Sequence, residues 1–131
     1  MKSIDVFSNE EKFTYEFVEL ESWNIPFVNF LKKLTDIEIA DILTSIDELL
    51  EFFNRNQIPP SKISKFISDG IFELRVSLEN KTTRSFYFYL FGKRVVFTHG
   101  IIKKTNKTDP KEIEKAKKYK NIYLKRNVNE N

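Results

Sequence analysis

The sequence predicts an α+β fold: a first strand and two helices, then an antiparallel sheet of three or four strands, then a C-terminal helix. Two patterns support this prediction. Apolar side chains recur at helical spacing over residues 36–54, whereas apolar and polar side chains alternate over residues 71–78, as in a strand with one buried face. A chain of 131 residues suits one domain. We expect that domain at residues 1–126, with a disordered tail at residues 127–131.

The first half of the chain predicts one strand and the two helices. Residues 12–21 are rich in β-branched and aromatic side chains, which favours a strand. Pro26 suits the first turn of a helix and predicts a short one over residues 26–34. Thr35, with a glutamate three residues later, forms a capping-box pattern that begins the long helix at residues 36–54.

The second half predicts an antiparallel meander and a closing helix. The expected strands follow one another in chain order and are separated by turn signals. They cover residues 63–68, 71–78, 84–91 and 94–102. Residues 84–91 are apolar at almost every position, which is typical of a central strand covered on both faces. Asp109 as the cap and Pro110 at the first helical position predict a last helix that runs to about residue 125.

Composition excludes several kinds of site. The chain has no cysteine, so it has no disulfide scaffold, thiolate zinc site or cysteine nucleophile. Its single histidine excludes a two-histidine acid–base pair and a His-rich metal site within one chain, and we expect neither a metal nor a cofactor. The N-terminus has no apolar signal run and the chain has no 18-residue apolar stretch, so we expect a cytoplasmic protein without membrane contact.

Charge is unevenly distributed along the chain. Residues 93–126 contain 12 lysines and arginines against 3 acidic residues, whereas residues 1–60 contain 5 against 12. Segregated positive charge of this kind favours a polyanionic partner, and nucleic acid is the main candidate. A basic face with no such partner is the alternative reading.

Two arginines are the first candidate site residues. If the hairpin turns near Glu79 and Asn80, Arg75 and Arg84 lie opposite each other on neighbouring strands. Two guanidinium groups in that arrangement repel each other unless an anion lies between them. Glu73 offers an internal carboxylate and hence an ordinary ion-pair network. The alternative is a clamp for a phosphate, whose oxygens match the guanidinium fork.

Lysines near the end of the last strand extend this candidate site. Lys103 and Lys104 follow the strand directly and would complete a basic patch beside the arginine pair. Lys107 and Lys111 continue the positive field toward and into the last helix.

The aromatic candidates have competing interpretations. His99 lies within a strand and is either a packed structural residue or a catalyst. Tyr87 either stacks on a base or fills the core. Trp23 is expected to pack near the start of the first helix.

Residues 69–76 (DGIFELRV) and 84–116 (RSFYFYLFGKRVVFTHGIIKKTNKTDPKEIEKA) resemble the RelE/HigB superfamily of type II toxin–antitoxin toxins, most closely its phage-derived, HigB-like branch. The resemblance covers about residues 63–120, with its motifs in order and at the expected spacing. Ile101 departs from the pattern where an aromatic residue is usual, and Asp109 is an insertion.

The resemblance implies a RelE-like fold and a metal-independent endoribonuclease that cuts mRNA in the ribosomal A site. It also implies a cognate helix-turn-helix antitoxin of the HigA-like kind, contact with ribosomal RNA, and indirect binding of operator DNA through the antitoxin complex. By resemblance, Arg84 contacts the scissile phosphate, Arg75 binds RNA or supports Arg84, and Lys103 or Lys104 neutralises charge. The candidate catalytic residues are Arg84, Arg75, Lys104 and His99, and the candidate RNA-binding residues are Lys103, Lys107, Tyr87 and Lys111.

Several alternatives stay open at the level of sequence. A ParE-like inhibitor of DNA gyrase has the same fold without the chemistry, and a phage-derived binding module would lack toxicity. The general base is His99, a lysine with a lowered pKa, or a tyrosine. The antitoxin either covers the basic face or clamps the acidic helix at residues 36–54.

Overall fold

The computed structural model describes residues 11–104 and 107–130. Its elements, in chain order, are β1 (Thr14–Phe17), the 3₁₀ turn η1 (Glu21–Trp23), α2 (Pro26–Leu31), α3 (Asp36–Asn54), β2 (Ser64–Ser68), β3 (Ile71–Ser77), β4 (Thr82–Leu90), β5 (Arg94–Lys103) and α4 (Pro110–Glu130). The predicted α+β class is confirmed, and so is the order of its elements. The first strand and the first helix are shorter than the sequence patterns predict.

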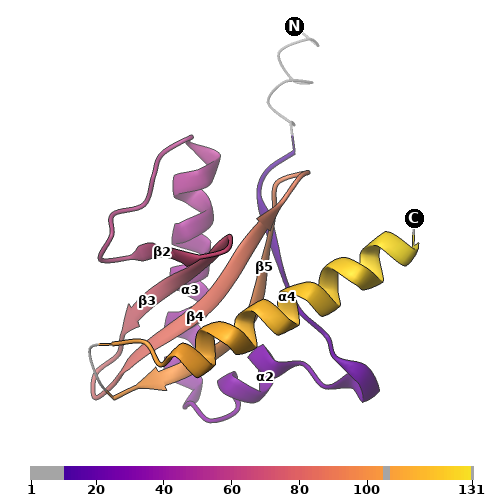
Figure 1. The fold of residues 1–131 in the computed structure, drawn as a ribbon. Helices are drawn as coiled ribbons and strands as arrows, with labels where there is room; N and C mark the ends of the chain where they lie inside the picture. Colours follow the sequence, from indigo (N-terminus) through magenta and orange to yellow (C-terminus); the bar gives the residue numbers. More distant parts are fainter. Residues whose placement is uncertain (1–10, 105–106, 131) are drawn as a thin grey trace, which may run out of the picture.

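The strands form one mixed sheet in the order β1-β5-β4-β3-β2. Strands β2 to β5 are the predicted antiparallel meander (Figure 1). β1 adds a fifth strand, which pairs in parallel with β5 from Thr14 opposite Arg94 to Phe17 opposite Phe97. The sheet is therefore larger than the antiparallel three- or four-stranded sheet predicted. Parallel pairing joins strands through a long crossover, so neighbouring sequence does not indicate that the first strand belongs to this sheet.

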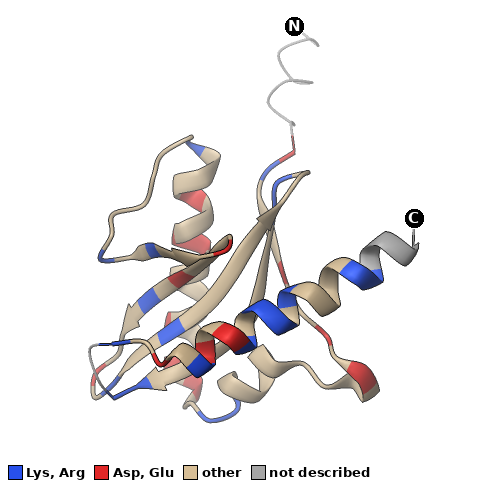
Figure 2. Cartoon of the chain, viewed as in Figure 1, with Lys and Arg blue, Asp and Glu red and all other residues tan. Residues whose placement is uncertain are grey.

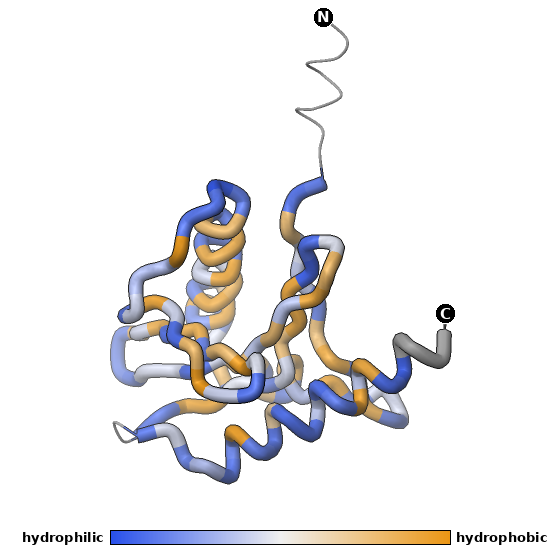
Figure 3. The backbone as a smooth tube through the Cα atoms, turned by 45° about the horizontal axis from the view of Figure 1, so that its top comes forward, coloured by the Kyte–Doolittle hydropathy of each residue, from blue (hydrophilic) through white to orange (hydrophobic). Residues whose placement is uncertain are grey.

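Helices α2 and α3 cover one face of the sheet. The capping box at Thr35 is present: Glu38 N–H donates to its hydroxyl, and its own N–H donates to the Glu38 carboxylate. From this start α3 buries a single apolar stripe against the sheet, visible as the inner orange side of the helix in Figure 3. The stripe consists of Ile42, Ile46, Leu49, Leu50 and Phe53.

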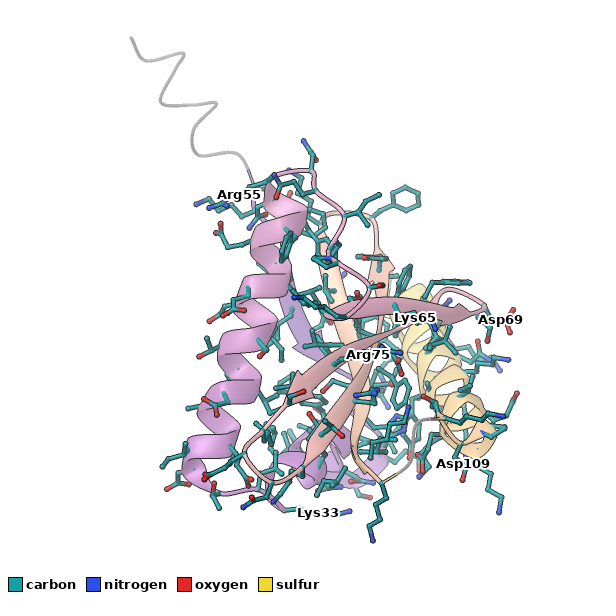
Figure 4. All side chains as sticks on the ribbon, turned by 90° about the vertical axis from the view of Figure 1, so that its left-hand side faces the viewer. Lys33, Arg55, Lys65, Asp69, Arg75 and Asp109 are labelled. Atoms are coloured by element: carbon teal, nitrogen blue, oxygen red, sulfur yellow. The ribbon has the colours of Figure 1, made fainter. Side chains whose placement is uncertain are left out.

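Helix α4 covers the other face, so the sheet lies between two helical layers (Figure 4). Ala116 and Tyr123 of α4 pack on a second apolar cluster that includes Phe86, Phe88 and Val96. Phe86 and Phe88 face α4, whereas Tyr87 between them faces α3. β4 is therefore the central strand covered on both faces, as its sequence predicts.

Side chains of β1, β5 and α4, three segments distant in sequence, contact one another. Arg94 Nε of β5 donates to Glu16 Oε2 of β1 at 2.9 Å, and the Tyr123 hydroxyl of α4 contacts both side chains. α4 itself continues to Glu130, beyond its predicted end and into the predicted tail. The physical reason is that no proline or glycine follows Pro110 to stop the helix.

Two further observations concern the surface. Trp23 was expected to pack, but its side chain is 85% exposed, so that prediction is wrong. Its backbone φ of 64° and that of Ser22 at 62° place both residues in the left-handed region, in a turn at the surface. Across the described residues, every helix is too short or too polar to cross a bilayer.

Candidate active site

Arg75 and Arg84 lie directly opposite each other on β3 and β4, as the sequence predicts. Because opposite residues of an antiparallel pair share a face, both side chains project from the face that carries α4. Glu73 and Phe86 form the next pair on that face. The tight Glu79–Lys81 turn fixes this register, since Leu78 N–H donates to the carbonyl of Lys81 at 2.8 Å.

Glu73 lies between the two arginines and is almost fully buried, with 1% of its surface exposed. Arg75 Nε donates to Glu73 Oε1 at 2.9 Å, and Arg84 Nε approaches the same oxygen at 3.6 Å. The hydroxyl of Thr108 donates to the other carboxylate oxygen, Oε2, at 3.2 Å. The internal ion-pair network, one of the two alternatives open at the sequence level, is therefore present.

Positive charge around this carboxylate exceeds what it can neutralise. Lys65 of β2 is directly opposite Glu73 and so belongs to the same face. Lys103, at the end of β5, donates from Nζ to the Thr108 hydroxyl at 3.4 Å. We call Lys65, Arg75, Arg84 and Lys103 the basic cluster: four cations around one carboxylate. Lys65 and Arg75 are labelled in Figure 4.

Partial burial makes Arg84 the most unusual member of the basic cluster. Its side chain is only 12% exposed. Burial lowers its pKa, the Glu73 carboxylate opposes that shift, and Arg75 adds to it. Arg84 Nε is buried and lacks a hydrogen-bond partner among the described residues, although one terminal nitrogen donates to the Thr83 carbonyl at 3.2 Å. A buried donor without an acceptor costs free energy, which an anion bound at this point would recover.

Lys103 is electrostatically coupled to the rest of the cluster. Burial lowers its pKa, and Arg84 lowers it further, partly offset by Glu73. Arg75 and Lys65 contribute in the same direction as Arg84. A larger fraction of this lysine is therefore neutral near pH 7 than for a lysine in water.

The remaining predicted lysines flank the cluster. Lys104 follows the last residue of β5 and is exposed, so Lys103 rather than Lys104 belongs to the cluster. Strand alternation explains the difference, because Lys103 shares a face with Ile101, the partner of Arg84. Lys107 and Lys111 are exposed beside the N-terminus of α4 and continue the positive field along that helix (Figure 2).

His99 lies beneath α4, and its surface is 4% exposed. Its Nε2 is 3.0 Å from Glu112 Oε1, and its ring stacks on Phe86 with centroids 4.9 Å apart. Burial lowers the pKa of His99 to about 4, although Glu112 opposes the shift. The imidazole is therefore neutral near pH 7 and joins β5 to α4. This environment favours the structural interpretation over the catalytic one.

Tyr87 does not belong to the candidate site, which corrects its assignment as an RNA-binding residue. It is fully buried on the opposite face of the sheet, where its ring stacks on Phe72 at 5.5 Å. Its hydroxyl shares a hydrogen bond with the hydroxyl of Ser64. A bulge between Phe86 and Tyr87 shifts the pairing with β5, but Tyr87 stays on the α3 side. Burial raises its pKa, so it stays protonated.

Sequence reasoning missed two contributors to the site. Lys65 gave a usable signal, because a strand at residues 64–68 in antiparallel register with β3 brings it opposite Glu73. Thr108 gave none, since its contact with Glu73 depends on how the chain passes from β5 to α4. The described residues contain no cluster of three or more histidine, aspartate and glutamate side chains that could hold a metal ion.

The fold and the basic cluster together describe an α+β protein with a cationic site on one sheet face, beside the start of its last helix. Residues 29–121 match the family model described as phage derived protein Gp49-like (DUF891). Because this match covers more than half of the chain, the chain belongs to that family, which is part of the RelE/HigB-like toxin superfamily. Membership indicates a toxin of the toxin–antitoxin type and implies a cognate antitoxin. No curated protein matches the chain.

Proposed function

We propose that this protein is a HigB-like toxin with a RelE-like fold that cleaves mRNA in the ribosomal A site. The observation that carries the proposal is Arg84: a partly buried guanidinium inside a cluster of four cations, whose Nε is close to Glu73 but has no hydrogen-bond partner among the described residues. Such a group is suited to the phosphate of a bound RNA strand, since guanidinium groups bind phosphate oxygens in a fork-like geometry. Residues 1–126 act as one domain in this proposal.

The proposed reaction uses the nucleophile that RNA itself supplies. The 2′-hydroxyl oxygen attacks the adjacent phosphorus, a new P–O bond forms, and the bond to the 5′-oxygen of the next nucleotide breaks. Negative charge grows on the non-bridging oxygens during this step. Arg84 and Arg75 stabilise that charge, and Glu73 holds both guanidinium groups in position before the RNA arrives. The departing 5′-oxygen takes up a proton from water, and the products are a 2′,3′-cyclic phosphate and a 5′-hydroxyl.

Lys103 is the proposed general base for the 2′-hydroxyl proton. Among the three candidates left open by the sequence, it combines a lowered pKa with a position in the basic cluster. His99 is covered by α4, and Tyr87 lies on the opposite face. Lys104 then serves as a phosphate contact rather than as a member of the reacting group, and Lys107 and Lys111 bind messenger or ribosomal RNA.

The proposed partners follow from the same reading. A HigA-like helix-turn-helix antitoxin neutralises the toxin, and the pair binds operator DNA through the antitoxin. Ribosomal RNA positions the message over the basic cluster. The reaction needs no metal in this scheme, because the basic cluster supplies the positive charge.

A translation reaction with purified protein tests the proposal. New 5′ ends of the mRNA are mapped with and without ribosomes, for the unsubstituted protein and for Arg84→Ala. Arg55→Ala is the matched control, because Arg55 is an exposed arginine of the α3 end that pairs with Glu51 away from the cluster. Cleavage that needs ribosomes, is lost in Arg84→Ala and is retained in Arg55→Ala supports the proposal. Intact mRNA with broken DNA in cells would instead favour gyrase inhibition, and intact mRNA without toxicity would favour a binding module.

A further inference from the structure

An apolar groove of about 760 Å³ lies on the sheet face opposite the basic cluster. It is bounded by the C-terminal end of α3, by β2 and by the β4–β5 hairpin. Its lining includes Phe13, Phe53, Phe66, Phe72, Tyr89 and Phe91. We call it the aromatic groove.

The aromatic groove is exposed to a degree unusual for such side chains. Phe66 is 54% exposed, Phe91 is fully exposed, and Ile58 on the rim is 93% exposed. The rings contact one another, with Phe66 and Phe72 centroids 5.3 Å apart and Phe72 and Tyr89 centroids 4.9 Å apart. Exposed apolar surface that is continuous in this way marks an interaction site more often than an isolated exposed residue does.

The groove borders a strand with an unpaired edge. β2 is the last strand in the sheet order, so only one of its edges is paired. Arg75 N–H donates to the Ile63 carbonyl at 2.7 Å, and the register continues with Ser64 opposite Leu74 and Phe66 opposite Phe72. Pairs in an antiparallel ladder alternate between bonded and non-bonded positions. Since residue 63 is bonded to β3, the N–H and C=O of Phe66 point outward from the sheet.

Charge along this edge is positive. Lys62 and Lys65 are both exposed, and the acidic residue that follows β2, Asp69, pairs with Lys117 of α4 at 2.8 Å. A second copy of the chain on this edge would bring two such lysine pairs together, which is unfavourable. An acidic strand is favoured for the same reason.

We propose that the aromatic groove and the free edge of β2 form the docking surface for an extended segment of the cognate antitoxin. The segment alternates apolar and acidic side chains and adds to β2 as a further strand. Its backbone bonds to the outward groups of Phe66, as in other complexes formed by strand addition. Its apolar side chains enter the aromatic groove, because Phe66 faces that side. The identity of the partner as an antitoxin rests on the proposed toxin function.

An added strand would place every second side chain on the face of the basic cluster. Side chains of the added strand beside Phe66 point into the groove, and those beside Lys65 point to the other face. Lys65 is a member of the basic cluster, opposite Glu73. Acidic side chains of the segment therefore reach the border of the cluster and compete there with RNA phosphate, while the rest of the segment stays on the α3 side.

The test measures binding of the purified antitoxin by calorimetry. All toxin variants carry Arg84→Ala so that the cells survive their production, and each variant is first shown to unfold at the temperature of its parent. Phe66→Glu and Phe91→Glu each replace an aromatic ring of the groove by a carboxylate. Ile37→Glu and Trp23→Glu are matched controls, because both residues are large, apolar and at least 77% exposed but do not line the groove. We expect each groove variant to weaken binding about tenfold or more and each control to leave it unchanged.

Amide hydrogen exchange separates strand addition from side-chain docking. Addition of the antitoxin should slow exchange of the Phe66 amide, which points outward in the free protein. An unprotected Phe66 amide in the complex overturns the strand addition. Weakened binding in Ile37→Glu but not in Phe66→Glu overturns the groove as the docking surface and assigns α3 instead. Protection of the Phe66 amide without antitoxin would identify a second copy or the chain's own N-terminal residues as the occupant, and would overturn the proposal as well.

Failure of the docking proposal can be distinguished from failure of the proposed function. Phe66→Glu without the Arg84 substitution should cleave mRNA on ribosomes at the rate of the unsubstituted protein. Loss of antitoxin binding with retained cleavage supports the docking surface. If the unsubstituted protein neither cleaves mRNA nor binds the antitoxin, the proposed function fails and the docking proposal fails with it. If it binds through the groove but does not cleave, only the enzymatic proposal fails.

Discussion

Replacing Glu73 by glutamine keeps the shape of the side chain but removes the negative charge at the centre of the basic cluster. The carboxylate is 1% exposed, so its interactions are little screened by water. The hydrogen bond from Arg75, at 2.9 Å, belongs to the class of charge-assisted bonds that contribute about 1.5–3 kcal/mol. Arg84, at 3.6 Å and only 12% exposed, loses its counter-charge as well. Removal of one partner from a buried pair costs about 3–5 kcal/mol. Because Arg75 is 30% exposed, we expect the lower end of that range, about 3 kcal/mol.

Urea unfolding measures this loss directly. Thermal unfolding gives a second measurement, since for a chain of this length a 3 kcal/mol loss should lower the melting temperature by about 10 °C. Glu51→Gln is the control, because its partner Arg55 and Glu51 itself are 69% and 59% exposed and such surface pairs contribute less than about 1 kcal/mol. Inorganic phosphate should stabilise Glu73→Gln more than the unsubstituted protein, because an anion can then occupy the position of the lost charge. The reasoning is refuted if Glu73→Gln unfolds at the same urea concentration as the unsubstituted protein, or if phosphate stabilises both equally.

Three further predictions concern the surroundings of the cluster. Burial lowers the pKa of His99 from its ordinary value of 6.5 to about 4, so the unsubstituted protein should lose up to about 3 kcal/mol of stability as the pH falls from 6.5 toward 4. His99→Gln should remove this loss, which urea titrations at each pH would measure. Gly100→Ala should cost about 1–3 kcal/mol, since a Cβ there would lie 2.6 Å from Cε2 of the Phe30 ring; an unchanged urea midpoint would mean that α2 moves aside freely. Lys103→Arg should lower mRNA cleavage about a hundredfold or more while preserving charge, and cleavage by the unsubstituted protein should rise with pH up to the lowered pKa of Lys103; equal pH–rate profiles would exclude Lys103 as the base.

Local patterns predict most of the fold because the physical causes are local. The capping box at Thr35 and the apolar stripe that follows it are contained within a few turns, and the structure has both. The register that brings Arg75 opposite Arg84 follows from one short turn, so it too can be derived from the sequence. The parallel pairing of β1 with β5 cannot, because nothing near Thr14 specifies a partner near Arg94.

The same contrast between local and long-range causes applies to the candidate site. Strand alternation predicts that Arg75, Arg84 and Glu73 share a face, and they do. Alternation along β4 also places Tyr87 on the opposite face from Arg84, so its exclusion from the site could be derived from the sequence. Which lysine joins the arginines depends on the exact end of β5. The burial of His99 depends on α4 crossing above it, which is a property of tertiary packing. These are the positions at which prediction from sequence alone fails.

The joining of β1, β5 and α4 through Glu16, Arg94 and Tyr123 also sets the order in which a newly made chain acquires its structure. Chains whose contacts join residues distant in sequence fold slowly, because the long loop between two such residues must close before their contact forms. During synthesis, β1 leaves the ribosome first but has no partner until the segment around Arg94 follows. The basic cluster forms later still, because Lys103 and Thr108, which complete it, leave the ribosome after Arg94. A nascent chain should therefore lack the complete basic cluster until almost all of it has emerged.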